Sequence, residues 1–249
     1  MRRLWLALLA LSPVTLSSVA GAVGWREYSF AHIPGGAGAG GWQPVAFWCD
    51  TPGRVLAVTT PARLPGPTTL AQWVGGHLTT APFSLGLPDP GAGNIYQSLT
   101  PAGQPVQPTS QYFVHSSNVE NVNDPAYRMT HVNEFQVPAG NFRCRYVPQA
   151  AVLAATARHS LTVWESGDRV TYASRNRDGT PGLQITGGQH TRTAQGQERY
   201  VWTRQGYQYV LEVASPNTAA PPGGSLSVLR GGRLLSREPL LAYTVSVPR

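Results

Sequence analysis

Apolar and polar residues alternate in short runs along the C-terminal part of the chain. The pattern predicts strands over 160–165, 169–174, 182–186, 198–204, 207–214, 225–230, 233–236 and 240–247. Turn sequences such as "ESGD", "NRDGTPG", "RQG" and "RGG" separate these strands. Evenly spaced short strands are typical of an antiparallel sandwich or a small barrel. We therefore expect a mainly β protein built from such units.

The N-terminal part has a less regular pattern. It predicts strands over 44–49 and 54–60, joined by "DTPG", and a hairpin over 110–118 and 126–137. In "TTLAQWVGGHLTT" (68–80), apolar residues recur at helical spacing from Leu70 to Leu78, and Thr68 suits a helix N-cap. We therefore expect one short helix in this half.

Two connecting segments complete the organisation of the chain. Residues 82–109 are rich in proline and glycine and predict a long irregular connection. Residues 148–157 ("PQAAVLAATA") predict a short helix or an apolar connector at the seam between two halves. The expected organisation is a signal peptide at 1–22, a flexible segment at 23–41, a disulfide-stapled β-rich half at 42–150 and an antiparallel β half at 151–249.

The first residues indicate export. A basic start at Arg2 and Arg3 precedes an apolar run at 4–11 and a small-x-small site that ends at Ala22. This arrangement is typical of a secretory signal peptide cut near Ala22. The apolar run is far shorter than a membrane span, which needs about 20 residues. We expect a mature protein that does not span a membrane and is secreted or periplasmic.

The amino-acid composition limits the classes of partner that the protein is expected to bind. The net charge of +7 falls to +5 when the signal peptide, with Arg2 and Arg3, is removed. All 19 basic residues are arginine. Codon bias in a GC-rich genome or recognition of phosphate and carboxylate groups would each explain the choice of arginine. The arginines are scattered, so we expect no nucleic-acid partner.

The two cysteines predict one disulfide. In an exporting compartment Cys49 and Cys144 permit a single intramolecular bridge. It would close a loop of about 95 residues, for which the chain-entropy model gives about 4–5 kcal/mol. Strand alternation places Cys144 beside Phe142 and sends Arg143 and Arg145 the opposite way, towards solvent or a partner. A reactive thiol is disfavoured because alternation turns the two guanidinium groups away from the sulfur.

Aromatic residues are densest on one predicted hairpin, at Tyr200, Trp202, Tyr207 and Tyr209. A two- or four-residue loop between 198–204 and 207–214 places all four on one face. They form either a stacking platform for a sugar or peptide, or the core of the second half. The face continues into leucine and valine, which favours the core.

No sequence motif indicates a metal or a cofactor. The oxygen-rich loop 117–125 lacks EF-hand spacing. His115 and His131 are expected to face each other across their hairpin, with Glu134 on the opposite face, and no zinc motif accompanies them. The glycines of "PGGAGAGG" (34–41) match GxGxxG but lack the flanking strand and helix of a dinucleotide site. We therefore expect no metal and no cofactor.

Catalytic motifs are also missing from the sequence. Neither GxSxG nor SxxK is present. Ser116 or Ser117 with His131 and Asp124 can be drawn as a triad, which only spatial geometry would support. Two carboxylates brought together by folding would be the other route to hydrolysis.

The stretch from "RYVWTRQGYQYVLEV" through "SLSVLRGGRLLSREPLLAY" resembles a segment of uncharacterised exported bacterial proteins. The resemblance is limited to this C-terminal part of the chain, and it implies no activity. From these sequence features we expect a non-enzymatic exported protein. It would bind an envelope polymer or a protein through loops and through aromatic and arginine surfaces. The alternatives are an envelope-polymer hydrolase and a structural or inhibitor-like module.

Overall fold

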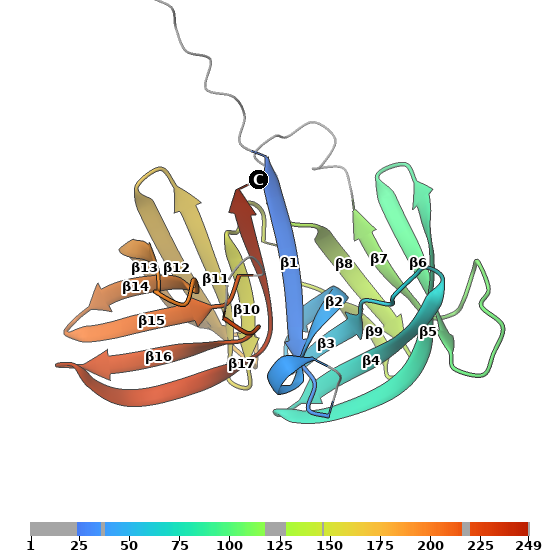
Figure 1. The fold of residues 1–249 in the computed structure, drawn as a ribbon, viewed down its shortest axis with the longest axis horizontal. Coiled ribbons are helices and arrows are strands. Elements are labelled where there is room, and N and C mark those ends of the chain that lie inside the picture. The colour runs from blue at the N-terminus through green and yellow to red at the C-terminus, as the bar shows by residue number, and fades with distance from the viewer. Residues whose placement is uncertain (1–23, 36–37, 118–127, 146, 216–219, 249) are drawn as a thin grey trace, which may run out of the picture.

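The computed structural model describes residues 24–35, 38–117, 128–145, 147–215 and 220–248. In these ranges the chain forms 17 strands, all paired antiparallel, and one 3-10 turn, η1 (Ala39–Gly41). The expected mainly β, antiparallel fold is therefore confirmed. The strands form two units with β1 (Trp25–His32) between them (Figure 1). The expected signal peptide lies outside the described residues.

The second unit is a closed barrel of eight strands. Its strands are β10 (Val152–Thr156), β11 (His159–Ser166), β12 (Arg169–Asn176), β13 (Pro181–Arg192), β14 (Glu198–Arg204), β15 (Tyr207–Val213), β16 (Gly224–Arg230) and β17 (Arg233–Pro248). The long β17 pairs with β16 through residues 233–239 and with β10 through residues 240–245. This second pairing closes the sheet, and closure removes the free edges of the barrel.

The first unit is a curled meander of eight strands. Its strands are β2 (Trp42–Thr51), β3 (Arg54–Thr59), β4 (Gly66–Val74), β5 (His77–Gly91), β6 (Asn94–Pro101), β7 (Phe113–Ser117), β8 (His131–Val137) and β9 (Gly140–Arg143). The expected disulfide Cys49–Cys144 is confirmed and ties β2 to the residue that follows β9. Beside it, the backbone N–H of Arg145 donates to Asp50 O at 2.9 Å. The first and last strands of the meander are therefore held together.

Strand β1 joins the two units into one continuous sheet (Figure 1). Its residues 25–31 pair with residues 242–248 of β17, and residues 30–32 pair with residues 42–44 of β2. A seam core of buried residues lies between the units and includes Ala31, Trp48, Trp73 and Ala242. Each unit has its own core besides, with Trp202 and Tyr243 in the barrel and Phe135 in the first unit.

The expected helix over 68–80 is wrong, because this segment forms β4, a turn and the start of β5. Strand β4 is buried on both faces: Leu70 lies in the core of the first unit, whereas Ala71 and Trp73 lie in the seam core. A strand buried on both faces does not alternate apolar with polar residues, and its run can match the helical spacing. In the described part of the chain η1 is the only helical element.

The two expected connections also contain strands. Residues 82–109 hold the end of β5 and all of β6, and Pro88 lies at a bulge that follows Leu85. The apolar segment 148–157 contains β10 of the barrel, so it is neither a helix nor a loop. None of the described residues forms a helix with the length and apolarity required to span a membrane.

Candidate functional site

A row of paired residues crosses the outer face of the first unit. Asp89 on β5 pairs with Tyr96 on β6, Tyr96 with His115 on β7, His115 with Glu134 on β8, and Glu134 with Arg143 on β9. Residues that pair directly in antiparallel strands project from the same face. The opposite face of these strands carries the core of the first unit. We call Asp89, Tyr96, His115, Glu134 and Arg143 the cross-strand row.

Aromatic rings form the centre of the cross-strand row. The rings of Tyr96 and His115 are stacked, with centroids 4.4 Å apart and planes 7° apart. The rings of Phe113 and Tyr96 form a T-shaped pair with centroids 5.4 Å apart. Tyr96 is 41% exposed, whereas Phe113 and His115 are half-buried. Tyr96 is therefore an accessible ring that rests on two supporting rings.

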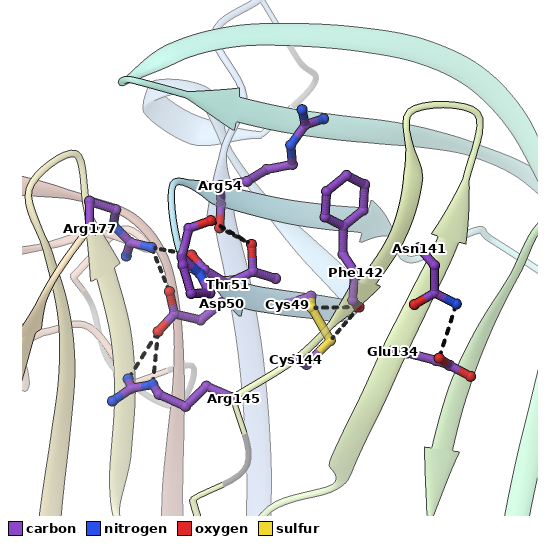
Figure 2. Close-up of a disulfide and its surroundings, with 11 residues drawn as sticks. Cys49, Asp50, Thr51, Arg54, Glu134, Asn141, Phe142, Cys144, Arg145 and Arg177 are labelled. Atoms are coloured by element: carbon purple, nitrogen blue, oxygen red, sulfur yellow. Dashed lines mark hydrogen bonds and ion pairs between the residues drawn. A yellow bond between two sulfur atoms is a disulfide. The ribbon is translucent and has the colours of Figure 1, made fainter. Parts of the chain in front are cut away.

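Hydrogen-bonding groups fix the imidazole beneath Tyr96. Nε2 of His115 lies 2.8 Å from Asn94 Oδ1 and 3.1 Å from Asn133 Nδ2, and its Nδ1 lies 3.4 Å from Glu134 Oε1. Asn141 Nδ2 in turn donates to Glu134 Oε2 at 3.1 Å (Figure 2). The supporting ring is thus held from both nitrogens, and the orientation of the aromatic pair is preorganised.

The expected arrangement of the two histidines is wrong. His115 pairs with Glu134, and beyond a bulge between His115 and Ser116 the residue paired with His131 is Ser117. Glu134 therefore lies on the face of His115, and His131 lies opposite Ser117 instead of opposite His115. In the described ranges no three His, Cys, Asp or Glu side chains are grouped to hold a metal ion. The oxygen-rich loop lies outside the described residues from 118 to 125.

The triad that the sequence allows is brought together only in part. Ser117 lies opposite His131 across β7 and β8, but its Oγ donates to Gly93 O at 2.9 Å. Ser116 is buried on the core side of β7, and Asp124 lies outside the described residues. Because the Ser117 hydroxyl is already donating to a backbone carbonyl, it is not poised to transfer its proton to His131.

The two arginines beside Cys144 have different environments. Arg143 is exposed at the end of the cross-strand row. Arg145, expected to point to solvent or a partner, instead donates from Nε to Asp50 Oδ2 at 3.1 Å, and its Nη2 lies 3.0 Å from the same oxygen (Figure 2). Strand β9 ends at Arg143, so strand alternation does not govern Arg145. Burial lowers the pKa of Arg145, and the opposing effect of Asp50 does not cancel it.

Asp50 is the centre of a seam cluster that joins the units. This buried carboxylate also accepts from Arg177 Nη1 at 2.6 Å and from Ser160 Oγ at 2.9 Å. Arg177 lies on the turn between β12 and β13 of the barrel and donates further to the carbonyl oxygens of Thr156 and His159. We call Asp50, Arg145, Ser160 and Arg177 the seam cluster, and its satisfied bonds indicate a structural role.

The aromatic hairpin is divided between core and surface. Tyr200 and Trp202 are each 1% exposed and lie in the core of the barrel. Trp202 Nε1 donates to Val170 O at 3.2 Å. Tyr207 and Tyr209 are half-buried, and the guanidinium of Arg230 lies 5.1 Å from the ring centroid of Tyr207. Of these four aromatic residues, a ligand in solvent can therefore reach only the two near the hairpin turn.

One end of the barrel carries a cluster of charged groups that sequence reasoning missed. His190 places Nδ1 2.8 Å from Glu165 Oε1 and Nε2 2.8 Å from Glu198 Oε2. Arg128 pairs with Glu165 at 2.8 Å, and Arg192 pairs with Glu198 at 2.6 Å. We call these five residues the barrel-end cluster. They come from β11, β13, β14 and the residues before β8, and no sequence spacing links them.

The barrel-end cluster is charged at neutral pH. Burial disfavours the charged form of His190, but the two glutamates outweigh burial and raise its pKa to about 9. Burial likewise disfavours ionisation of Glu165, but His190 and Arg128 outweigh it and lower its pKa to about 2. A general acid or base works best with a pKa near the operating pH. Glu165 and His190 are therefore placed to form ion pairs and not to transfer protons at neutral pH.

The central residue of the cross-strand row was also missed. Tyr96 lies in the segment 82–109, which the sequence predicts as irregular. The signal that could have found it is the β-prone pair Ile95-Tyr96, which directly follows the turn sequence "GAGN". Comparison of the chain with protein-family models, with curated proteins and with solved structures gave no match.

Proposed function

We propose that the protein is an exported, non-enzymatic binding protein whose cross-strand row binds a carbohydrate polymer of the cell envelope or its surroundings. The observation that carries the proposal is the exposed Tyr96 ring, stacked on a fixed His115 within a line of polar side chains. An aromatic ring combines apolar contact area with defined geometry. The flat face of a sugar ring offers the matching surface, and its hydroxyl groups match the polar neighbours.

The shape of the row supports an extended ligand. The row crosses five strands, and adjacent strands are about 4.8 Å apart, so its length is about 19 Å. Carboxylates at Asp89 and Glu134 accept hydrogen bonds, while Asn141 and Arg143 donate them. Sugar hydroxyls require both kinds of partner. Because Glu134 and Asn141 are already bonded to each other, less side-chain entropy is lost on binding.

Two features favour binding over hydrolysis. In the barrel-end cluster, Glu165 and His190 titrate far from neutral pH, so neither is suited to donate a proton to a leaving group. The pairing of Ser117 with His131 resembles a nucleophilic site, but the serine proton is engaged by Gly93 O. Neither place therefore holds a group that is activated for hydrolysis.

Affinity electrophoresis of the mature chain (residues 23–249) in gels that contain neutral and acidic polysaccharides tests the proposal. We expect Tyr96→Ala to weaken binding about five- to tenfold, because a stacked aromatic contributes about 1 kcal/mol, or about fivefold, and its buried area adds to this. Tyr207→Ala is the matched control, since it removes an accessible tyrosine from the barrel. Circular dichroism checks that both variants fold.

The possible outcomes separate the hypotheses. Loss of binding in Tyr96→Ala with retention in Tyr207→Ala supports the cross-strand row. The reverse result moves the site to the barrel hairpin, and binding that neither substitution weakens excludes both surfaces. No retardation by any polymer at low salt overturns the proposal. Release of new reducing ends from a retained polymer would identify the protein as a hydrolase.

A further inference from the structure

We infer that the protein has a second binding site, a hollow of about 320 Å³ that takes a carboxylate or phosphate group. The hollow lies between residues 147–148 of the linker after β9 and the outer face of the barrel strands β11 to β13. Its polar lining includes Arg145, Thr162, Arg175 and Gln184, and the ring of Trp164 forms part of its wall. It shares none of its lining with the cross-strand row and is argued independently of it.

Positive charge is in excess around this hollow. Arg145 and Arg177 share one carboxylate, Asp50, and Arg175 lies close enough for its charge to act on Arg145. Arg175 itself is exposed, and no hydrogen bond or ion pair joins its side chain to another described residue. Three arginines with one aspartate leave a surplus of two positive charges. The next acid on this turn, Asp178, is exposed and accepts its bonds from Thr180.

A buried hydroxyl in the hollow has no partner. Thr162 is 1% exposed, and its Oγ1 makes no hydrogen bond within the described residues. Buried polar atoms in proteins are normally hydrogen-bonded. An oxygen of a bound anion would accept from this hydroxyl. The unpartnered hydroxyl of Thr162 distinguishes the hollow from an ordinary group of surface arginines.

The walls of the hollow are fixed. Trp164 Nε1 donates to Pro148 O at 3.0 Å, which holds the indole ring against the linker. At Gly182, a Cβ atom would lie only 2.5 Å from Ser174 Oγ, so β13 can approach β12 this closely only with glycine. Fixed walls reduce the entropy cost of binding.

The lining selects an oxyanion. The planar guanidinium group of arginine presents parallel N–H donors that match two oxygens of a carboxylate or phosphate. Arg175 has its donors free for a ligand, and Arg145 uses two of its nitrogens on Asp50. The hydroxyl of Thr162 offers a further donor. The volume of about 320 Å³ suits a small acidic group such as a uronate or a phosphorylated sugar.

Thermal shift and titration calorimetry on the mature chain test this site with inorganic phosphate and with sodium glucuronate, at constant ionic strength set by sodium chloride. A ligand that binds the folded state alone raises the Tm by mass action. We expect Arg175→Gln to weaken binding at least tenfold and Thr162→Val to weaken it several-fold. Arg233→Gln, which changes an exposed arginine on the β16–β17 hairpin, is the matched control and should bind as the wild type does.

The responses to the two probes decide the outcome. A response to phosphate alone or to glucuronate alone identifies the anion, and a response to both supports the shared oxyanion chemistry. A response to neither probe overturns the site, as does equal weakening by Arg233→Gln, which would show a general charge effect. Tyr96→Ala should leave the response unchanged, so failure of this site and failure of the cross-strand row are distinguishable.

Discussion

His190 has a strongly raised pKa, and its environment shapes how stability depends on pH. The pKa is raised from the ordinary 6.5 to about 9. The stabilisation is therefore complete below about pH 6.5 and is lost as the pH rises through 9. Glu165, with a pKa lowered from 4.5 to about 2, contributes above about pH 4.5 and loses its contribution as the pH falls through 2. Both contributions are complete together only between pH 4.5 and 6.5.

We predict that the Tm of the chain spanning residues 23–249 falls by about 2–4 °C between pH 6.5 and 9.5. This corresponds to about 1 kcal/mol, a value reduced for the solvent screening of a partly exposed histidine. Differential scanning calorimetry measures the change. His190→Gln should lower the Tm at pH 6 and flatten the decline above pH 6.5. A variant that keeps the wild-type slope would show that other groups cause the decline.

The arginines around Cys144 show where residue-level reasoning succeeds and where it fails. Alternation correctly predicts an exposed Arg143, because this residue still belongs to β9. Arg145 lies two residues beyond, after the strand has ended, and its position is decided by Asp50, far earlier in the chain. A contact between residues so distant in the chain has no effect on the local alternation of apolar and polar residues. The seam cluster could therefore not be predicted from sequence.

At the scale of the element, prediction depends on how many faces a strand buries. Strands β11 to β16 each have one face in the barrel core, and the sequence locates all six. It divides β17 into two strands and misses β10, and residues 240–247 of β17 and most of β10 are buried on both faces. Strand β4 is buried on both faces and resembles a helix. The sequence offers one correct signal there, the Gly75-Gly76 pair, because a two-residue hairpin needs a positive φ at both central positions. The observed φ values are +56° and +82°.

The β4–β5 turn provides a test of this explanation. Gly76→Ala places a Cβ at a φ of +82° and 3.3 Å from the Cβ of Ala157. We predict a loss of about 1–2 kcal/mol in the free energy of unfolding, because the left-handed conformation brings a Cβ too close to the backbone. Urea denaturation measures the loss.

Gly75→Asn is the control for this turn. Asparagine tolerates the left-handed region, and nothing lies within 4 Å of the added Cβ. Urea denaturation should find this variant within about 0.5 kcal/mol of wild type. Equal losses in both variants would contradict a turn of this type.

At the scale of the whole molecule, the two units close by different means. The barrel is closed by backbone pairing of β10 with β17. In the first unit, β2 and β9 are not paired as strands within the described residues; the disulfide and the backbone bond from Arg145 N to Asp50 O hold the ends of the meander together. The cross-strand row lies on the outer face of the first unit, which is closed in this second way. The geometry of the row therefore depends on the disulfide, whereas the barrel is closed by backbone hydrogen bonds alone.

Removal of the disulfide should destabilise the first unit more than the barrel. We predict that the double variant Cys49→Ala, Cys144→Ala loses about 2–5 kcal/mol of unfolding free energy, because the bridge constrains a long loop in the unfolded chain. Hydrogen exchange followed by mass spectrometry should show faster exchange in β2 to β9, while the core strands of the barrel stay protected. Reductant should reproduce this pattern in the wild type and leave the double variant unchanged. Parallel loss of protection in both units would instead show that β1 and the seam core make the molecule unfold as one body.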